Sequence, residues 1–146
     1  MTTVKHSEQA GEAGRALFAN DRASKGLGMD LVAVEAGVAS VNMIVRPDMT
    51  NGHGICHGGF IFALADSAFA FACNSHGPAT VAAAVAIDFL VPARVGDLLT
   101  ALATERWLRG STGLYDLVVT RADGTAIAHA RGRSQRLRTT ASTSTT

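Results

Sequence analysis

The sequence predicts one α+β domain in which an antiparallel β-sheet wraps around one long central α-helix. The segment from Gly59 to Asn74 is apolar on nearly all sides, and a helix of that kind has to be enclosed by other elements. Segments of alternating apolar residues precede and follow it, separated by short turns that contain glycine. An antiparallel sheet folded around the helix encloses it, which favours an α+β fold over a doubly wound parallel sheet.

The first part of the chain supplies a helix and two strands. Residues 1–30 are predicted to be an N-terminal segment with a short helix over Ala10–Asn20, preceded by polar, frayed residues. Apolar residues then alternate over Leu31–Val45, which predicts two strands joined by a turn at Glu35–Gly37. Pro47 ends the second strand because proline cannot donate to a ladder.

Four more strands are predicted after the central helix, over residues 81–91, 98–107, 114–120 and 126–137. Glycine-containing turns separate the last three of them. Residues 31–138 therefore form the main domain. The Ser/Thr-rich tail, residues 139–146, has no apolar anchor and is expected to be disordered.

Composition excludes several kinds of partner. A net charge of +1 argues against nucleic acid and against an anionic membrane surface. The longest apolar run, Phe60–Cys73, is too short to cross a bilayer and contains an acid. Only two cysteines, Cys56 and Cys73, and the lack of an apolar leader segment predict free thiols in the cytoplasm.

The candidate site begins at the loop Asn51–Gly59, which is rich in glycine and leads directly into the central helix. A helix start of this kind presents free backbone N–H groups that can hold an oxygen atom. Asp66, two turns into the apolar helix, is a lone carboxylate whose burial is costly unless it has a function or a partner. The alternative is a structural role, in which Asp66 caps another group or pairs with a buried arginine.

The spacing of Gly59 and Asp66 predicts a symmetric dimer. Seven residues return to nearly the same helix face, but the rise between them is about 10 Å. One carbonyl group therefore contacts both residues only if they come from two chains, which gives two shared sites per dimer. The N–H of Gly59 would polarise an acyl carbonyl, and Asp66 of the other chain would attack it or activate a water.

Other chemistries are weaker candidates at this loop. His53 and His57 have the spacing of metal ligands on a helix, but the glycines between them disfavour a helix and no third ligand is evident. Cys56 beside His57 lacks a recognisable partner acid, and Ser67 lacks the glycine elbow of serine hydrolases. We expect neither a metal nor another cofactor.

Several segments together resemble the hotdog-fold thioesterases of the phenylacetate-degradation (PaaI) type. The similarity spans about Leu31–Leu137, and its most specific part is His-Gly-Gly followed at a fixed offset by Leu-Ala-Asp-Ser-Ala. The segments that carry it are Asn51–Gly59, Leu64–Ala70, Asn74–Gly77, Ile87–Ala93 with Gly96 and Asp97, and Thr112–Asp116.

The resemblance implies an activity, an assembly and residue roles. Members of this family hydrolyse acyl-CoA thioesters, including phenylacetyl-CoA and its hydroxylated relatives, without a metal or cofactor, and they form homodimers that pair into tetramers. It assigns the catalytic carboxylate to Asp66 and the backbone donor to Gly59. Asn51 and His57 match positions that orient the loop and the substrate.

The substrate contacts are predicted less directly. Related enzymes place a Ser or Thr on the strand after the central helix, and here only Thr80 has a hydroxyl in that region. Arg131 and Arg133 share one strand face, where they either defend a solvated edge or bind a phosphate of coenzyme A. Apolar residues near Phe60, Leu64 and Phe69 are expected to line the acyl pocket. The full set of predicted substrate-binding residues is Gly58, Phe60, Ser67, Thr80, Arg131 and Arg133.

Two other functions stay open. A hotdog protein could bind acyl-CoA as a non-catalytic regulatory module, but such a sensor has no use for an acid that faces the carbonyl. A hydratase or dehydratase needs an acid and a histidine together on the central helix, and this helix contains no histidine.

Overall fold

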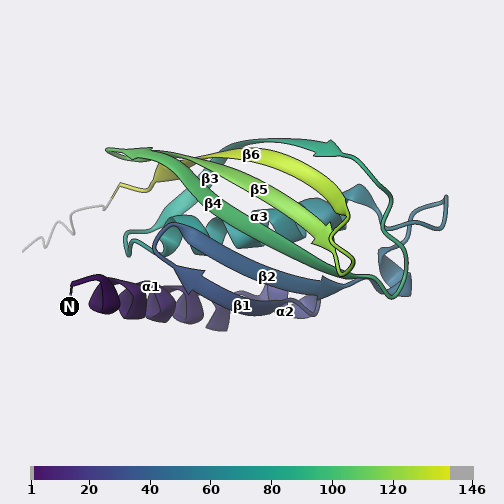
Figure 1. Cartoon of the computed structure of the whole chain (residues 1–146), viewed down its shortest axis with the longest axis horizontal. Coiled ribbons are helices and arrows are strands. Elements are labelled where there is room, and N and C mark those ends of the chain that lie inside the picture. The colour runs from purple at the N-terminus through teal and green to yellow at the C-terminus, as the bar shows by residue number, and fades with distance from the viewer. Residues whose placement is uncertain (1, 139–146) are drawn as a thin grey trace, which may run out of the picture.

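The computed structural model describes residues 2–138, which form one six-stranded sheet and three α-helices (Figure 1). The elements in chain order are α1 (Thr2–Ala19), α2 (Arg22–Gly26), β1 (Asp30–Glu35), β2 (Val38–Ile44), a 3-10 turn (Pro47–Met49), α3 (Gly58–Asn74), β3 (Thr80–Phe89), β4 (Leu98–Arg109), β5 (Thr112–Arg121) and β6 (Ala126–Arg136).

The sheet is antiparallel throughout and has the strand order β1-β2-β4-β5-β6-β3. It curves over α3, and α1 runs beside β1 at one edge (Figure 1). The predicted arrangement, an antiparallel sheet around one central helix, is confirmed. Because β3 follows α3 in sequence but lies beyond β6 in the sheet, the chain returns to the far edge before it fills the middle.

The core lies between α3 and the inner face of the sheet. The alternation predicted along β2 is confirmed, since Ala39, Val41 and Met43 are buried. Leu64 and Phe69 of α3, which the sequence predicts near the acyl pocket, are also fully buried in one chain, and the Phe69 ring packs against Tyr115 of β5.

One stripe of α3 is not covered by the sheet. The partly exposed residues recur at helical spacing, so they share one face of the helix. After the first turn they are Phe62, Ala63, Asp66, Ser67, Ala70 and Asn74. The helix is thus less completely enclosed than its composition predicts, and its uncovered stripe contains the one carboxylate.

The N-terminal helices differ from the prediction. Helix α1 begins at Thr2 and not at Ala10, so the polar residues predicted to fray are helical. Helix α2 has no counterpart in the prediction. Its N-cap is Asp21, whose side chain accepts a hydrogen bond from the backbone N–H of Ser24 at 2.9 Å.

Two further observations concern the chain as a whole. Within residues 2–138, no helix is long and apolar enough to cross a membrane. The tail over 139–146, which the sequence predicts to be disordered, lies outside the described residues.

Candidate active site

The loop before α3 is ordered by Asn51. Its side-chain Oδ1 accepts hydrogen bonds from the backbone N–H of His53 at 2.9 Å and of Ile55 at 3.4 Å. The backbone adds a hydrogen bond in which the Asn51 N–H donates to the Ile55 carbonyl at 2.9 Å. These bonds close the loop on itself and fix the direction in which the chain enters the helix.

The first N–H groups of α3 are not equivalent. His57 is the N-cap, and its Nδ1 accepts the N–H of Gly59 at 2.9 Å. The N–H of Phe60 donates to the His57 carbonyl at 3.0 Å. The N–H of Gly58 has no hydrogen-bond partner among residues 2–138, so it is the open donor at this helix end.

A cavity of about 380 Å³ lies at this end of α3. Asn51 and Gly58 line it together with the segment Phe89–Pro92, which begins at the last residue of β3. Phe60 does not line it and instead packs its ring edge-on against the His57 ring, with centroids 6.1 Å apart. This cavity therefore brings two of the predicted residues, Asn51 and Gly58, to one place.

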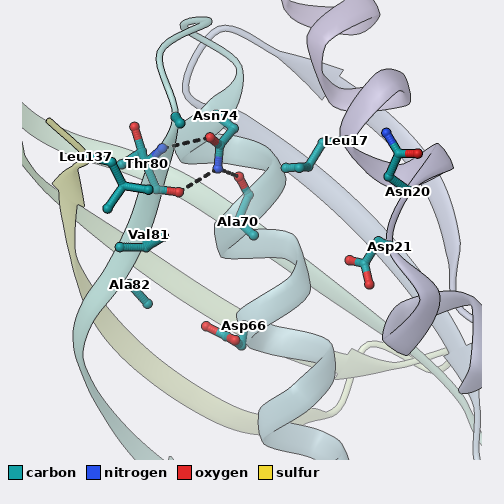
Figure 2. Close-up of a pocket in the computed structure, with 11 residues that line it drawn as sticks. Leu17, Asn20, Asp21, Asp66, Ala70, Asn74, Thr80, Val81, Ala82 and Leu137 are labelled. Carbon is teal, nitrogen blue, oxygen red and sulfur yellow. Dashed lines mark hydrogen bonds between the residues drawn. The ribbon is translucent and has the colours of Figure 1, made fainter. Parts of the chain in front are cut away.

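Asp66 lies in a second and larger pocket of about 580 Å³ (Figure 2). On one side of α3 are Thr80–Ala82 of β3, and on the other are Asn20 and Asp21, which join α1 to α2. The half-buried Asp66 has no hydrogen-bond or ion-pair partner among the described residues. That observation argues against the alternative in which Asp66 caps a group or pairs with an arginine.

The environment of Asp66 favours its protonated form. Burial raises the pKa of the Asp66 carboxyl, and the negative charge of Asp21 raises it further. A carboxylate with raised proton affinity and no partner is a stronger base than an exposed one.

Asn74 connects α3 to β3 at the wall of this pocket (Figure 2). Its Nδ2 donates to the carbonyls of Ala70 at 2.8 Å and Thr80 at 2.9 Å, and its Oδ1 accepts the Thr80 N–H at 2.9 Å. The Thr80 hydroxyl donates to the Pro78 carbonyl at 2.9 Å, and its lone pairs remain to accept. Thr80 and Asp66 thus line the same pocket.

Other predicted residues lie elsewhere. The Ser67 hydroxyl is bonded to that of Ser24 at 2.8 Å and does not line either pocket. A Cβ on Gly132 would point at the Phe69 ring of α3, so its neighbours Arg131 and Arg133 project from the opposite sheet face. Arg131 is ion-paired with Asp116 at 3.2 Å. Within one chain, neither arginine is near Asp66.

The loop does not gather metal ligands or an activated thiol. Residues 2–138 contain no group of three or more His, Cys, Asp or Glu side chains placed to hold a metal ion. Cys56 is buried, and burial together with the charge of Asp97 raises the pKa of its thiol. This disfavours a thiolate nucleophile at Cys56.

Sequence reasoning missed the contribution of Asn20, Asp21 and Asn74 to the pocket. Asn74 ends the predicted helix and begins one of the segments that resemble the family, but the sequence gives it no role in the site. Asn20 and Asp21 lie more than forty residues before Asp66 in a segment without a motif. Only the packing of α1 and α2 against α3 brings them to the pocket.

Fold and site together define a class. The family model of the thioesterase superfamily matches residues 53–128, which include the helix-start loop from His53 onward and Asp66. The chain belongs to this superfamily, and its architecture is the hotdog fold predicted from the sequence.

Individual relatives narrow the class. The chain is 45% identical to the acyl-coenzyme A thioesterase PaaI of Escherichia coli over 131 residues, which are 90% of this chain and 94% of that protein. The structure of Escherichia coli PaaI superposes with a TM-score of 0.89, covering 92% of this chain and 97% of that one. A Streptococcus mutans protein solved with acetyl CoA is 27% identical, with a TM-score of 0.72 over 75% of this chain and 88% of that one. The predicted resemblance to PaaI-type thioesterases is confirmed.

Proposed function

We propose that this protein hydrolyses phenylacetyl-CoA, hydroxyphenylacetyl-CoA or similar short or aryl acyl-CoA thioesters to the free acid and coenzyme A. The observation that carries this proposal is the Asp66 carboxylate, which has no partner within the described residues and lines an open pocket in a homologue of acyl-CoA thioesterases. A thioester carbonyl needs a donor for its oxygen and a nucleophile for its carbon, and no metal is required.

In this mechanism the start of α3 holds the carbonyl oxygen. The N–H groups of Gly58 and Gly59 point out of the positive end of the helix, where a developing negative charge is stabilised. Since the Gly59 N–H donates to His57 Nδ1, His57 has to turn away before both groups bind one oxygen. Asn51 holds the loop that presents these donors.

Asp66 acts as the nucleophile or as the general base for water. As nucleophile, its oxygen attacks the carbonyl carbon and the C–S bond breaks, so coenzyme A leaves as the thiolate and takes a proton from water; a second water then hydrolyses the mixed anhydride. As general base, it takes a proton from water, whose oxygen attacks directly and expels the same thiol. Thr80 is placed in the same pocket to contact the water or the acyl group.

The proposed site is shared between two chains. The pockets of Gly58 and Asp66 have no residue in common, in agreement with the distance expected along the helix. The uncovered stripe of α3 and the edge strand β3 supply surface for a second copy, since Val81 is 45% and Phe89 53% exposed. We therefore propose a homodimer with two shared sites that pairs into a dimer of dimers.

Further parts of the proposed function follow from this assembly. Residues 1–30 form an N-terminal segment on the thioesterase domain, residues 31–138, and contribute the Asp21 side of the pocket. Arg133, and Arg131 if it leaves Asp116, would contact coenzyme A phosphates only across a subunit boundary. Phe60 and Ser67 would contact substrate through the same assembly. Two buried free cysteines agree with a cytoplasmic location.

The test compares the wild type with Asp66→Asn on phenylacetyl-CoA and on linear acyl-CoAs, following the release of free thiol. The variant keeps the side-chain volume and removes the base, so we expect kcat to fall roughly 10²- to 10⁴-fold without loss of the fold. Asp48→Asn, which removes a carboxylate from an exposed ion pair with Arg46, is the matched control.

Two results would contradict the proposal. Full activity of Asp66→Asn would exclude the mechanism. Saturable acyl-CoA binding by the wild type, without thiol release from any thioester, would instead support a regulatory acyl-CoA-binding protein.

A further inference from the structure

A chain of hydrogen bonds connects α2 to α3 immediately beside Asp66. The Ser24 hydroxyl is 2.6 Å from Asp21 Oδ2 and 2.8 Å from the Ser67 hydroxyl. An ionised carboxylate only accepts hydrogen bonds, so Ser24 donates to Asp21 and Ser67 donates to Ser24. Ser24 is 2% exposed, which makes this a buried connection and not a surface contact.

These hydrogen bonds fix a second carboxylate, that of Asp21, in the wall of the Asp66 pocket. Both oxygens of Asp21 are bound by Ser24, one by the backbone N–H at 2.9 Å and the other by the hydroxyl. The carboxylate therefore cannot turn away from its position as a free surface acid would. The orientation of the Asp21 carboxylate is set by its role as the N-cap of α2. The hydrogen bond between Ser24 and Ser67 in turn holds α2 against α3.

Asp21 is the one other titratable group in the described lining of this pocket. The segment Ala79–Ala82 and Leu137, which form the opposite wall, contribute no charged side chain. On α2, Lys25 donates to the Ala19 carbonyl at 2.7 Å and does not line the pocket. On α3 itself, burial raises the pKa of the Cys73 thiol to about 12, and the nearby charge of Asp66 acts in the same direction. The Cys73 thiol therefore stays neutral.

We propose that Asp21 is a positioning residue for thioester hydrolysis: the Ser67–Ser24–Asp21 chain holds its negative charge in the pocket and keeps Asp66 a strong base. The inference rests on the proposed function and adds a role for the N-terminal segment. Two carboxylates that share a pocket cannot ionise independently, so the fixed charge of one sets the proton affinity of the other.

The test is the pH dependence of kcat/KM for phenylacetyl-CoA in the wild type and in Asp21→Asn. Asparagine still caps α2 but carries no charge. We expect the acid limb, where Asp66 loses its proton, to move to lower pH by about 0.5 to 1 unit. Ser24→Ala keeps the charge of Asp21 but removes the hydroxyl that connects Asp21 to Ser67, so it should shift the acid limb by less. Asp48→Asn, outside the pocket, should leave it unmoved.

A second readout separates this inference from the proposed function. The carboxyl carbon of Asp66, identified by its absence in Asp66→Asn, is titrated by ¹³C NMR in the wild type and in Asp21→Asn. An acid limb and an Asp66 titration that stay at the wild-type pH in Asp21→Asn would overturn the role of Asp21. If no thioester is hydrolysed, the proposed function fails, and the NMR titration still decides whether Asp21 sets the protonation of Asp66. Asp21→Ser, which also caps, replaces Asp21→Asn if the latter does not fold.

Discussion

At the scale of the residue, the site depends on how backbone and side-chain groups are paired. Asp66 has no partner in the described structure, whereas Asp116, a partly exposed acid, is bound by Arg106 and Arg131, which hold its pKa below the usual range. The same contrast separates Gly58, whose N–H is open, from Gly59, whose N–H is bound by His57. Unpaired polar groups at a pocket are costly for folding, and this cost is typical of catalytic sites.

This cost predicts how the stability of Asp66→Asn depends on pH. The pKa of Asp66 is raised on folding, so its ionised form destabilises the native state at pH values above that raised pKa. At neutral pH we expect Asp66→Asn to melt a few degrees above the wild type. The difference should shrink as the pH falls from the raised pKa toward 3.8, and below 3.8 the carboxyl is protonated in both states, so this effect is lost. Thermal denaturation followed by circular dichroism at several pH values measures this difference in melting temperature. If Asp66→Asn is less stable than the wild type at neutral pH, Asp66 has a structural role.

At the scale of the element, the position of α3 against the sheet is set by close packing. The Phe69 ring occupies the space beside Gly132 of β6 and lies 5.1 Å from the Tyr115 ring, measured between centroids. Tyr115 is in turn held by a hydrogen bond from its hydroxyl to Glu105 at 2.9 Å. The packing of Phe69 against Gly132 and Tyr115 thus positions the helix that contains Asp66.

Gly132→Ala tests this packing. A Cβ at this position would lie 2.7 Å from the Phe69 ring, which is fully buried and cannot move aside freely. We expect the free energy of unfolding in urea to decrease by about 1–3 kcal/mol, as overpacked cores show. Gly26→Ala is the matched control, since its Cβ would meet no atom within 4 Å. Equal stability of both variants would contradict the described contact of α3 with β6.

At the scale of the whole molecule, the two halves of the proposed site lie in separate pockets of one chain. The donor pocket is at the start of α3, and the Asp66 pocket is on its uncovered stripe. Pairing of two copies through this face would bring Gly58 of one chain to Asp66 of the other. The assembly, and not the single chain, would then be the unit of catalysis.

Mixing two inactive variants tests the shared site. Gly58→Pro removes the open N–H, and proline is well tolerated at the first position of a helix. Refolding an equal mixture of Gly58→Pro and Asp66→Asn should restore about a quarter of wild-type activity, because half of the dimers are mixed and each has one intact site of two. Each variant refolded alone is the control. A mixture as inactive as its components would place the whole site within one chain.

Much of the fold was accessible from local pattern. The alternation in β2, the glycine turns and the apolar composition of α3 are local features, because each depends only on residues that are neighbours in the sequence. The strands and the helix predicted after Leu31 therefore agree with the structure, whereas the order of the strands in the sheet could not be predicted from them. Helix α1 was predicted to begin too late, because its polar first turns show no periodicity that marks a helix.

By itself the sequence determined the sheet around a helix and the thioesterase family, and it predicted the helix-start loop and Asp66 as the site. These depend on residue type and spacing along one helix. The tertiary structure alone decided which apolar residues of α3 face the core, that Gly59 is bound by His57, and that Asp21 joins the Asp66 pocket. Those features depend on which face of each element packs against a distant segment, and spacing along the chain does not contain that information.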